Sequence, residues 1–238
     1  MINTAVIMAA GLGTRFGDRT ELIPKGFIEV YGIPMIIRSI ETLIECGIER
    51  IIIGVGYKRE VYEALKRQYS QIECCFSPEY ATTNSMWTLG LCRDLVGTDD
   101  FLLLESDLIY EAKAIRALME DQHTDIMLIA EETKFQDQYF VEHDGRGNLV
   151  NCSVRRNELT VCGELVGIHK LSNSFYCQLC DYYDSVKSEK PKLGYEFVLL
   201  YLARNIRPMF VLKVPDLKWY EIDDELDWEY VEKSRILL

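Results

Sequence analysis

The order of apolar runs and amphipathic stretches along the chain is the feature that most constrains its fold. Four short apolar runs predict buried strands at residues 4–10, 50–56, 72–76 and 100–110. Four amphipathic stretches alternate with them and predict helices at residues 34–47, 58–69, 84–96 and 111–122. Strands and helices in regular alternation, joined by short connections, predict a parallel sheet with helices on both faces.

The second half of the chain is richer in strand patterns and less regular. Five segments predict strands at residues 125–132, 139–144, 149–154, 159–170 and 209–214. Three more segments predict helices at residues 172–187, 194–205 and 224–237. The sequence contains no internal repeat and no linker of biased composition, so we expect one α/β domain with an inserted β-rich region.

The net charge excludes some classes of partner. The 238 residues carry a formal net charge of −12, so we expect no basic surface for a nucleic acid or an anionic membrane. The first residues lack the pattern of a signal peptide, and no apolar run approaches the ~18 residues that span a bilayer. We therefore expect a cytoplasmic protein.

The eight cysteines and three histidines do not form a recognisable metal site. Most of the cysteines lie inside apolar segments, where a thiol packs like a small hydrophobic side chain. Cys177 and Cys180 have CxxC spacing, but no second such pair exists and no histidine stands at ligand spacing. We expect these thiols to be inert and the histidines to be surface or core residues.

A glycine-rich stretch directly after the first predicted strand indicates phosphate binding. Gly11 and Gly13 lack a Cβ atom, so the backbone there can close around a phosphate chain. The spacing does not fit a dinucleotide fingerprint, because Phe16 stands where the third glycine belongs, and no P-loop ending in Gly-Lys-Ser/Thr is present. A long loop then leads to Lys25. We expect Arg15 and Lys25 to grip a triphosphate from two sides.

Two aspartates are placed to hold a metal ion. Asp107 follows the apolar run FLLL, and Asp223 lies where a strand-like segment meets the last predicted helix. Ligands of open parallel sheets bind at the carboxyl edge of the strands, and Mg²⁺ prefers carboxylate and phosphate oxygens. For Asp224 an N-cap role is favoured, which leaves Asp223 for the metal. Glu105 points the same way as Asp107 and is a further candidate.

The stretch AAGLGTRFGDRTELIPKGFIEVYGIPMIIRSIETL resembles the opening of the nucleotidyltransferases. The residues that match the family's motifs are Gly11, Gly13, Thr14, Arg15, Pro24, Lys25, Gly32 and Pro34. The resemblance implies a Rossmann-like, three-layer fold with a mostly parallel sheet. It also implies attack by a phosphoryl or phosphonyl oxygen on the α-phosphorus of a nucleoside triphosphate, with pyrophosphate leaving. Arg15, Lys25, Asp107 and Asp223 would be catalytic, and the two aspartates would hold Mg²⁺.

Polar residues after the third predicted strand are suited to reading a nucleoside. The stretch SPEYATTNSMWTLG resembles a region of bacterial phosphocholine cytidylyltransferases, which implies cytidine as the base. Capping of the following helix is an alternative role for Asn84 or Ser85. The expected nucleotide-binding residues are Ala10, Gly11, Gly13, Thr14, Arg15, Lys25, Tyr80, Thr83, Asn84 and Ser85.

The acceptor is expected to be a small zwitterion that carries an ammonium group. The segment CGELVGIHKLS resembles head-group cytidylyltransferases, and the Glu-Lys-Pro motif of sugar nucleotidyltransferases is missing. The expected acceptor-binding residues, mostly acidic or aromatic, are Glu131, Glu164, Tyr195, Glu196, Trp219 and Arg155. Gly26-Phe27 resembles 2-aminoethylphosphonate cytidylyltransferases more than phosphocholine ones, so we favour 2-aminoethylphosphonate over phosphocholine.

Other functions stay open at this point. They are transfer to another small phosphorylated amine or to a sugar 1-phosphate, methylerythritol phosphate cytidylyltransfer, and nucleotide binding without catalysis. Within a single domain of residues 1–238, we expect a nucleotide-binding part at about 1–110 and an acceptor-binding part at about 111–238. The sequence leaves open whether the chain forms a homodimer or belongs to a longer fusion protein.

Overall fold

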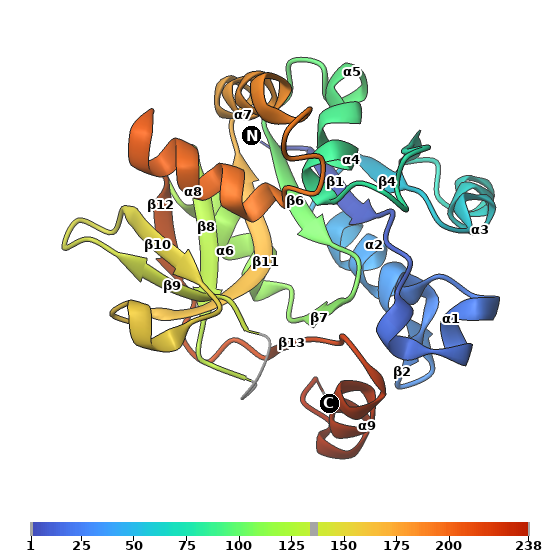
Figure 1. The fold of residues 1–238 in the computed structure, drawn as a ribbon. Helices are drawn as coiled ribbons and strands as arrows, with labels where there is room; N and C mark the ends of the chain where they lie inside the picture. Colours follow the sequence, from blue (N-terminus) through green and yellow to red (C-terminus); the bar gives the residue numbers. More distant parts are fainter. Residues whose placement is uncertain (1, 134–137, 238) are drawn as a thin grey trace.

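A central nine-stranded sheet organises the protein, in the order β10-β9-β11-β6-β1-β4-β5, with β8 beside β11 and β12 beside β8 (Figure 1). The computed structural model describes residues 2–133 and 138–237. The strands of this sheet are β1 (Thr4–Ala9), β4 (Arg50–Val55), β5 (Ile72–Phe76), β6 (Phe101–Glu105), β8 (Ile126–Ala130), β9 (Phe140–His143), β10 (Leu149–Ser153), β11 (Gly163–Leu171) and β12 (Phe210–Lys213). Strands from both halves of the chain therefore share one sheet.

Four neighbouring strands pair in parallel, and β12 also pairs in parallel with β8. β1 pairs in parallel with β4 and β6, and β4 pairs in parallel with β5. Ile7 lies opposite Ile53 on one side and Leu104 on the other, and all three side chains are fully buried. Parallel strands buried on both faces read as continuous apolar runs, which is why the sequence locates them well.

The prediction of one continuous strand at residues 100–110 is wrong. The strand breaks at Ser106 and Asp107, and the following β7 (Leu108–Tyr110) leaves the main sheet to pair with β13 (Trp219–Glu221). Apolar residues on both sides of the break make it invisible in the hydrophobic pattern. The break turns Asp107 out of the ladder at the carboxyl end of β6.

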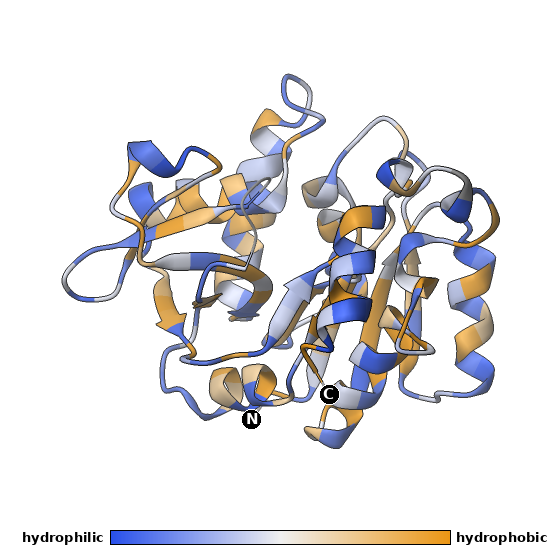
Figure 2. Cartoon of the chain, turned by 90° about the horizontal axis from the view of Figure 1, so that it is seen from below, coloured by the Kyte–Doolittle hydropathy of each residue, from blue (hydrophilic) through white to orange (hydrophobic). Residues whose placement is uncertain are grey.

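Helices cover both faces of the sheet and confirm the predicted three-layer α/β fold. One layer contains α2 (Met35–Glu45), α3 (Arg59–Ala64) and α6 (Lys113–Glu120). The other contains α4 (Ser85–Leu91), α5 (Arg93–Val96), α7 (Asn173–Val186) and α8 (Tyr195–Asn205). The helix predicted at residues 84–96 is thus two short helices. Figure 2 shows helices that carry both hydrophobic and hydrophilic residues. This is the pattern of a helix that buries one face against the sheet and exposes the other to solvent.

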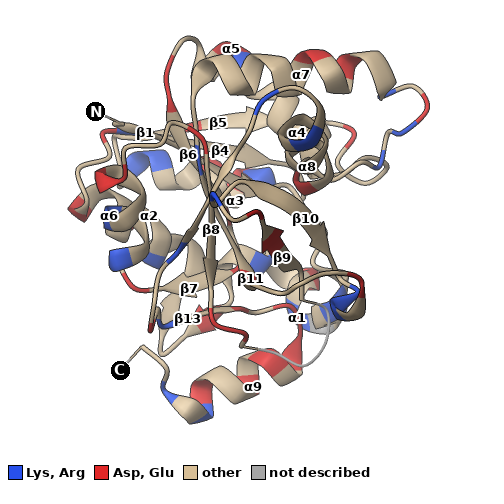
Figure 3. Ribbon diagram, turned by 90° about the vertical axis from the view of Figure 1, so that its left-hand side faces the viewer, with Lys and Arg blue, Asp and Glu red and all other residues tan. Residues whose placement is uncertain are grey.

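The C-terminal helix α9 (Glu225–Ser234) lies beside segments from the start of the chain (Figure 1). It packs in a third, smaller core with β2 (Glu29–Val30) and with Met35 and Phe16. Figure 3 shows acidic residues along α9. No helix within residues 2–133 and 138–237 is long and apolar enough to cross a membrane.

Candidate active site

A pocket of about 350 Å³ opens at the carboxyl ends of β1 and β6. The residues that line it come from the ends of β1 and β6 and the loops after them, from the loop after β5, from α3 and α4, and from the start of α8. They are Met8, Ala9, Ala10, Gly11, Leu12, Gly13, Lys25, Tyr62, Tyr80, Ala81, Thr83, Asn84, Ser85, Thr88, Glu105, Ser106, Asp107 and Tyr195. Ligands of open parallel sheets bind at this edge, and the volume suits a small molecule.

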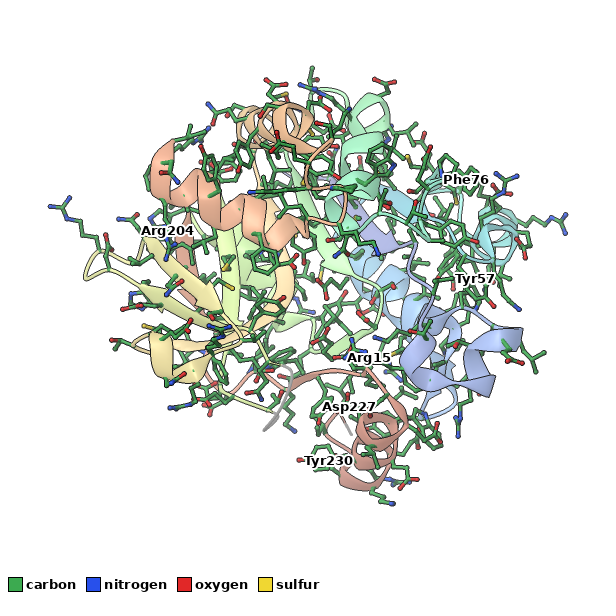
Figure 4. All side chains as sticks on the ribbon, viewed as in Figure 1. Arg15, Tyr57, Phe76, Arg204, Asp227 and Tyr230 are labelled. Carbon is green, nitrogen blue, oxygen red and sulfur yellow. The ribbon has the colours of Figure 1, made fainter. Side chains whose placement is uncertain are left out.

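Lys25 joins the two aspartates that the sequence singles out. Its Nζ donates to Asp223 Oδ1 at 2.8 Å and also to the Asp107 carboxylate. The Arg15 guanidinium donates from Nη2 to the same Asp223 oxygen, likewise at 2.8 Å. Figure 4 shows Arg15 next to the C-terminal segment that carries Asp227. Four residues expected to be catalytic, drawn from four separate segments, therefore meet at one point.

The electrostatics of this cluster keep Lys25 charged. Burial lowers the pKa of Lys25, but the Asp107 and Asp223 carboxylates outweigh burial and raise that pKa above its ordinary value. The side chain is only 14% exposed. A protonated amine is therefore held at the mouth of the glycine-rich loop, where it can bind phosphate oxygens.

The glycine-rich segment is held close to Lys25 by its backbone conformation. Gly13 has φ +65°, and a Cβ atom there would lie 3.1 Å from the Lys25 Cβ and 3.0 Å from a Thr20 methyl. Thr20 Oγ1 in turn donates to the Gly13 carbonyl at 3.0 Å. The expected long loop contains a short helix, α1 (Asp18–Leu22), because Thr20 and its neighbours form a helical turn against the glycines.

The last helix begins as the sequence predicts. The Asp224 side chain accepts hydrogen bonds from the backbone N–H groups of Leu226 and Asp227 and so caps α9. The preceding Asp223 points instead to Lys25 and Arg15. The capping prediction is confirmed, and it explains how two adjacent aspartates come to have different partners.

A second set of carboxylates lies beside the first. Ligand oxygens of Glu105, Asp107 and Glu221 all lie within 4.8 Å of one another. Carboxylate oxygens are the ligands that Mg²⁺ prefers, so both this trio and the pair of Asp107 and Asp223 fit a hard divalent cation. Asp107 belongs to both sets. The structure therefore offers two neighbouring positions for a cation along the edge of the sheet.

Glu105 is held in an unusual environment. Tyr195 Oη donates to Glu105 Oε1 at 2.5 Å. Burial raises the pKa of Glu105 well above its usual range, and the nearby Glu221 and Asp107 carboxylates raise it further. A positive group placed among these acids would relieve that cost, which makes this end of the pocket suited to a cation.

The predicted nucleotide-binding residues fall into two groups. Those that line the pocket are Ala10, Gly11, Gly13, Lys25, Tyr80, Thr83, Asn84 and Ser85. Thr14 and Arg15 instead begin the exposed 3-10 turn that follows Gly13. Asn84 is also the N-cap of α4, since its Oδ1 accepts from Ser85 N at 2.8 Å, and Ser85 Oγ accepts from Tyr195 N at 3.0 Å. Both residues thus combine a structural contact with a place in the pocket.

A second pocket of about 190 Å³ adjoins the first through Asn84, Ser85 and Glu105. Its other lining residues are Tyr139, Leu165, Val166, Gly167, Glu196 and Glu221. Of the six predicted acceptor-binding residues, Glu196 lines this pocket and Tyr195 lines the first one. Burial raises the pKa of Glu196.

The structure places the other four predicted acceptor-binding residues elsewhere. Glu131 and Arg155 are exposed and pair with Lys213 at 3.3 Å and with Glu158 at 2.9 Å. Glu164 is buried and accepts hydrogen bonds from the backbone and side chain of Thr133. Trp219 packs in the core on the α2 side of the sheet. Residue type suggested Glu131 and Trp219, and the family resemblance suggested Glu164 and Arg155; in the structure all four have other contacts.

Among the pocket residues that sequence reasoning missed are Tyr62, Tyr139 and Glu221. For Glu221 a signal exists, because it stands two residues before Asp223 in an extended segment, just as Glu105 stands two before Asp107. Tyr62 and Tyr139 carry no such signal. Their aromatic side chains fit a core pattern equally well.

Comparisons with known proteins show similarity to cytidylyltransferases. The chain is 36% identical over 105 residues to the 2-aminoethylphosphonate cytidylyltransferase of Lancefieldella rimae, a match that covers 44% of this chain and 43% of that relative. It is 24% identical over 228 residues to the choline-phosphate cytidylyltransferase of Haemophilus influenzae, 95% of each chain. The solved CTP:phosphocholine cytidylyltransferase from Streptococcus pneumoniae has the same fold, with a TM-score of 0.81, 23% identity and coverage of 98% and 100%.

A family model shows the identity of the chain more directly. The model described as the MobA-like NTP transferase domain matches residues 5–171, which include the glycine-rich segment, Lys25 and Asp107. This match covers more than half of the chain and confirms the resemblance found in the sequence. The protein therefore belongs to the family of MobA-like NTP transferase domains and is a nucleotidyltransferase.

Proposed function

We propose that this nucleotidyltransferase is a Mg²⁺-dependent cytidylyltransferase that joins CMP, taken from CTP, to 2-aminoethylphosphonate. A phosphonate oxygen of the acceptor forms a bond to the α-phosphorus of CTP. The bond from that phosphorus to the oxygen bridging to the β-phosphate breaks, and pyrophosphate leaves with the electron pair. The product is a phosphonate head group activated for a later transfer.

The proposed roles follow from the charges at the pocket. Arg15 and Lys25 bind nonbridging phosphate oxygens, and Lys25 holds the triphosphate over the end of β1. Asp107 and Asp223 are the proposed Mg²⁺ ligands, since both already contact one cationic group. When bound, Mg²⁺ supplies positive charge that neutralises the phosphates. The chain's own part is to align the acceptor oxygen with the α-phosphorus.

Cytidine is the proposed nucleoside. Tyr80, Thr83, Asn84 and Ser85 line the pocket and provide polar groups for a base edge and a ribose. Three of the relatives compared above are named cytidylyltransferases, which supports this choice. We propose that residues 1–110 supply most of the nucleotide contacts and residues 111–238 most of the acceptor contacts.

The observation that carries the choice of acceptor is the composition of the second pocket. Three carboxylates, Glu105, Glu196 and Glu221, border a space of about 190 Å³ next to the reaction centre. A primary ammonium has three N–H donors and suits carboxylate acceptors, whereas a quaternary ammonium has none and depends on aromatic faces. Tyr139 is the aromatic residue among the described residues that line this pocket. Three carboxylates against one aromatic ring favour an acceptor with a primary amine over one with a quaternary ammonium.

Phosphocholine is the second candidate. The match to the choline-phosphate cytidylyltransferase of Haemophilus influenzae spans 95% of both chains, against 44% of this chain for the phosphonate-specific relative. Tyr139 at the second pocket provides one face for a cation–π contact.

The experiment that tests the proposal measures pyrophosphate release with Mg²⁺ and CTP for four acceptors. These are 2-aminoethylphosphonate, phosphocholine, phosphoethanolamine and glucose 1-phosphate. We expect the highest kcat/KM with 2-aminoethylphosphonate, and a comparison of CTP with UTP, GTP and ATP should favour CTP. Preference for phosphocholine would show that aromatic contacts dominate the second pocket and would overturn the assignment to a primary amine.

A further inference from the structure

Gly26, directly after Lys25, is surrounded closely by a tyrosine and a backbone carbonyl. A Cβ atom at this position would lie 3.0 Å from Tyr62 Oη and 3.3 Å from the Ser106 carbonyl oxygen, both shorter than ordinary van der Waals contact. The backbone of Gly26 is not in the left-handed region, so an alanine could adopt its conformation. Space, rather than conformation, therefore demands glycine here.

Tyr62 reaches this point from α3, on the far side of the pocket from α4. It is 1% exposed, and its ring packs edge-on against Phe27 with ring centroids 5.0 Å apart. Its hydroxyl lies against Gly26, where a Cβ atom would touch both that hydroxyl and the Ser106 carbonyl oxygen. The Tyr62 hydroxyl is thus placed where the turn that carries Lys25 approaches the turn that carries Asp107.

We propose that Tyr62 is a positioning residue for nucleotidyl transfer, whose hydroxyl fixes the turn at Lys25 relative to the turn at Asp107, and that Gly26 is required because of that hydroxyl. The inference deepens the function proposed above and rests on it. Tyr62 acts through Lys25 and Asp107, the group that binds phosphate and the group that binds metal. For transfer, the separation of Lys25 from Asp107 must match the distance between the phosphate oxygen that Lys25 binds and the metal ion that Asp107 binds.

The physical reason for expecting an effect on rate is the steep dependence of transfer on alignment. A misplacement of about 1 Å in a reacting constellation costs on the order of 10²-fold in rate. Lys25 and Asp107 stand on separate turns that their side-chain ion pair joins. The Tyr62 hydroxyl lies against the junction of these turns and adds a second restraint, whereas a phenylalanine of the same shape keeps the packing against Phe27 and removes the hydroxyl.

The test is a double-mutant cycle with Tyr62→Phe, Gly26→Ala and the two combined. Pyrophosphate release is measured with Mg²⁺, CTP and either 2-aminoethylphosphonate or phosphocholine, whichever the wild-type protein converts faster. We expect Tyr62→Phe to lower kcat about tenfold, with KM for CTP changed less than about threefold. Gly26→Ala should lower kcat/KM more than tenfold alone but less than about threefold in the Tyr62→Phe background, because the shorter of the two close contacts is gone and only the one with the Ser106 carbonyl oxygen remains.

A matched control is Tyr176→Phe, which also removes a buried hydroxyl that donates to a backbone carbonyl, that of Leu89 at 2.6 Å. We expect its kcat and KM to equal those of the wild type, while its melting temperature falls. A Tyr62→Phe protein with wild-type kcat would overturn the positioning role. An equal loss from Gly26→Ala in both backgrounds would overturn the pairing.

The experiment distinguishes failure of the proposed function from failure of the inference about Tyr62 and Gly26. If the wild-type protein converts neither acceptor, the proposed function fails, and the cycle is then read from the affinity for CTP with Mg²⁺ in calorimetric titrations. Coupling between positions 26 and 62 in that affinity would still support the inference, and purely additive losses would overturn it. Melting curves of every variant check that the protein is folded.

Discussion

A buried histidine should make the stability of this protein depend on pH in a defined way. His169 lies on β11, is fully buried and packs edge-on against Tyr195 with ring centroids 5.5 Å apart. Within residues 2–133 and 138–237, neither ring nitrogen of His169 has a hydrogen-bond partner. Burial lowers the pKa of His169 from 6.5 to about 3. The folded protein therefore holds this imidazole neutral at pH values where the unfolded chain protonates it.

The sign and size of the effect follow from these two pKa values. Between pH 6.5 and about 3 the unfolded chain binds one more proton than the folded protein at this residue. The free energy of unfolding therefore falls as the pH falls, by about 1.4 kcal/mol per pH unit well below 6.5. From pH 7 to pH 5 the loss that His169 causes is about 2 kcal/mol.

The assay is urea unfolding of the wild type and of His169→Leu at pH 7, 6 and 5. The variant should lose about 2 kcal/mol less than the wild type over this range, because leucine does not titrate. Ile168→Val serves as a control, since it removes a buried methylene from the same strand at a cost of about 1 kcal/mol without changing a titrating group. Parallel pH profiles for the wild type and His169→Leu would refute the reasoning.

Other predictions concern the active site and its support. Asp107→Ala should reduce turnover at least about 10³-fold while weak CTP binding persists in calorimetry, and near-normal turnover would rule out its metal role. Glu196→Gln should raise KM for 2-aminoethylphosphonate about tenfold with little change in kcat, and an unchanged KM would remove Glu196 from the acceptor pocket. EDTA should abolish pyrophosphate release and added Mg²⁺ restore it; full activity in EDTA would contradict the proposed Mg²⁺ requirement. Arg19→Ala should destabilise the protein by about 1 kcal/mol in urea unfolding, because it loses its ion pair with Glu225 at 2.7 Å and its stacking on Trp228.

The parallel half of the fold could be predicted because each element there has a strong local signal. The strand that contains Ile7 is apolar after Thr4 and is followed closely by the glycine-rich stretch, and the helix after Pro34 has a regular apolar face. The glycine spacing and Lys25 also pointed to residues that line the first pocket. Asp107 and Asp223 could be singled out because each stands two residues after the end of a strand.

The rest depends on contacts between segments far apart in the sequence. Nothing local distinguishes Glu196, at the second pocket, from Glu131, which pairs with Lys213 on the surface. Trp219 looks like a binding residue by type, yet β13 turns it into the core. The break between β6 and β7 is likewise decided by the pairing of β7 with β13, a segment about a hundred residues later, so no window around Asp107 reveals it.

The ion pair of Arg15 with Asp223 joins residues 208 positions apart. Contacts of such long range form late, because the intervening chain must first be ordered. On a ribosome, Arg15 and Lys25 emerge long before Asp223. A partly made chain would then present Arg15 and Lys25 without Asp223. With the roles proposed above, nucleotide binding by a nascent chain is separated in time from catalysis, which waits until the C-terminal helix has docked.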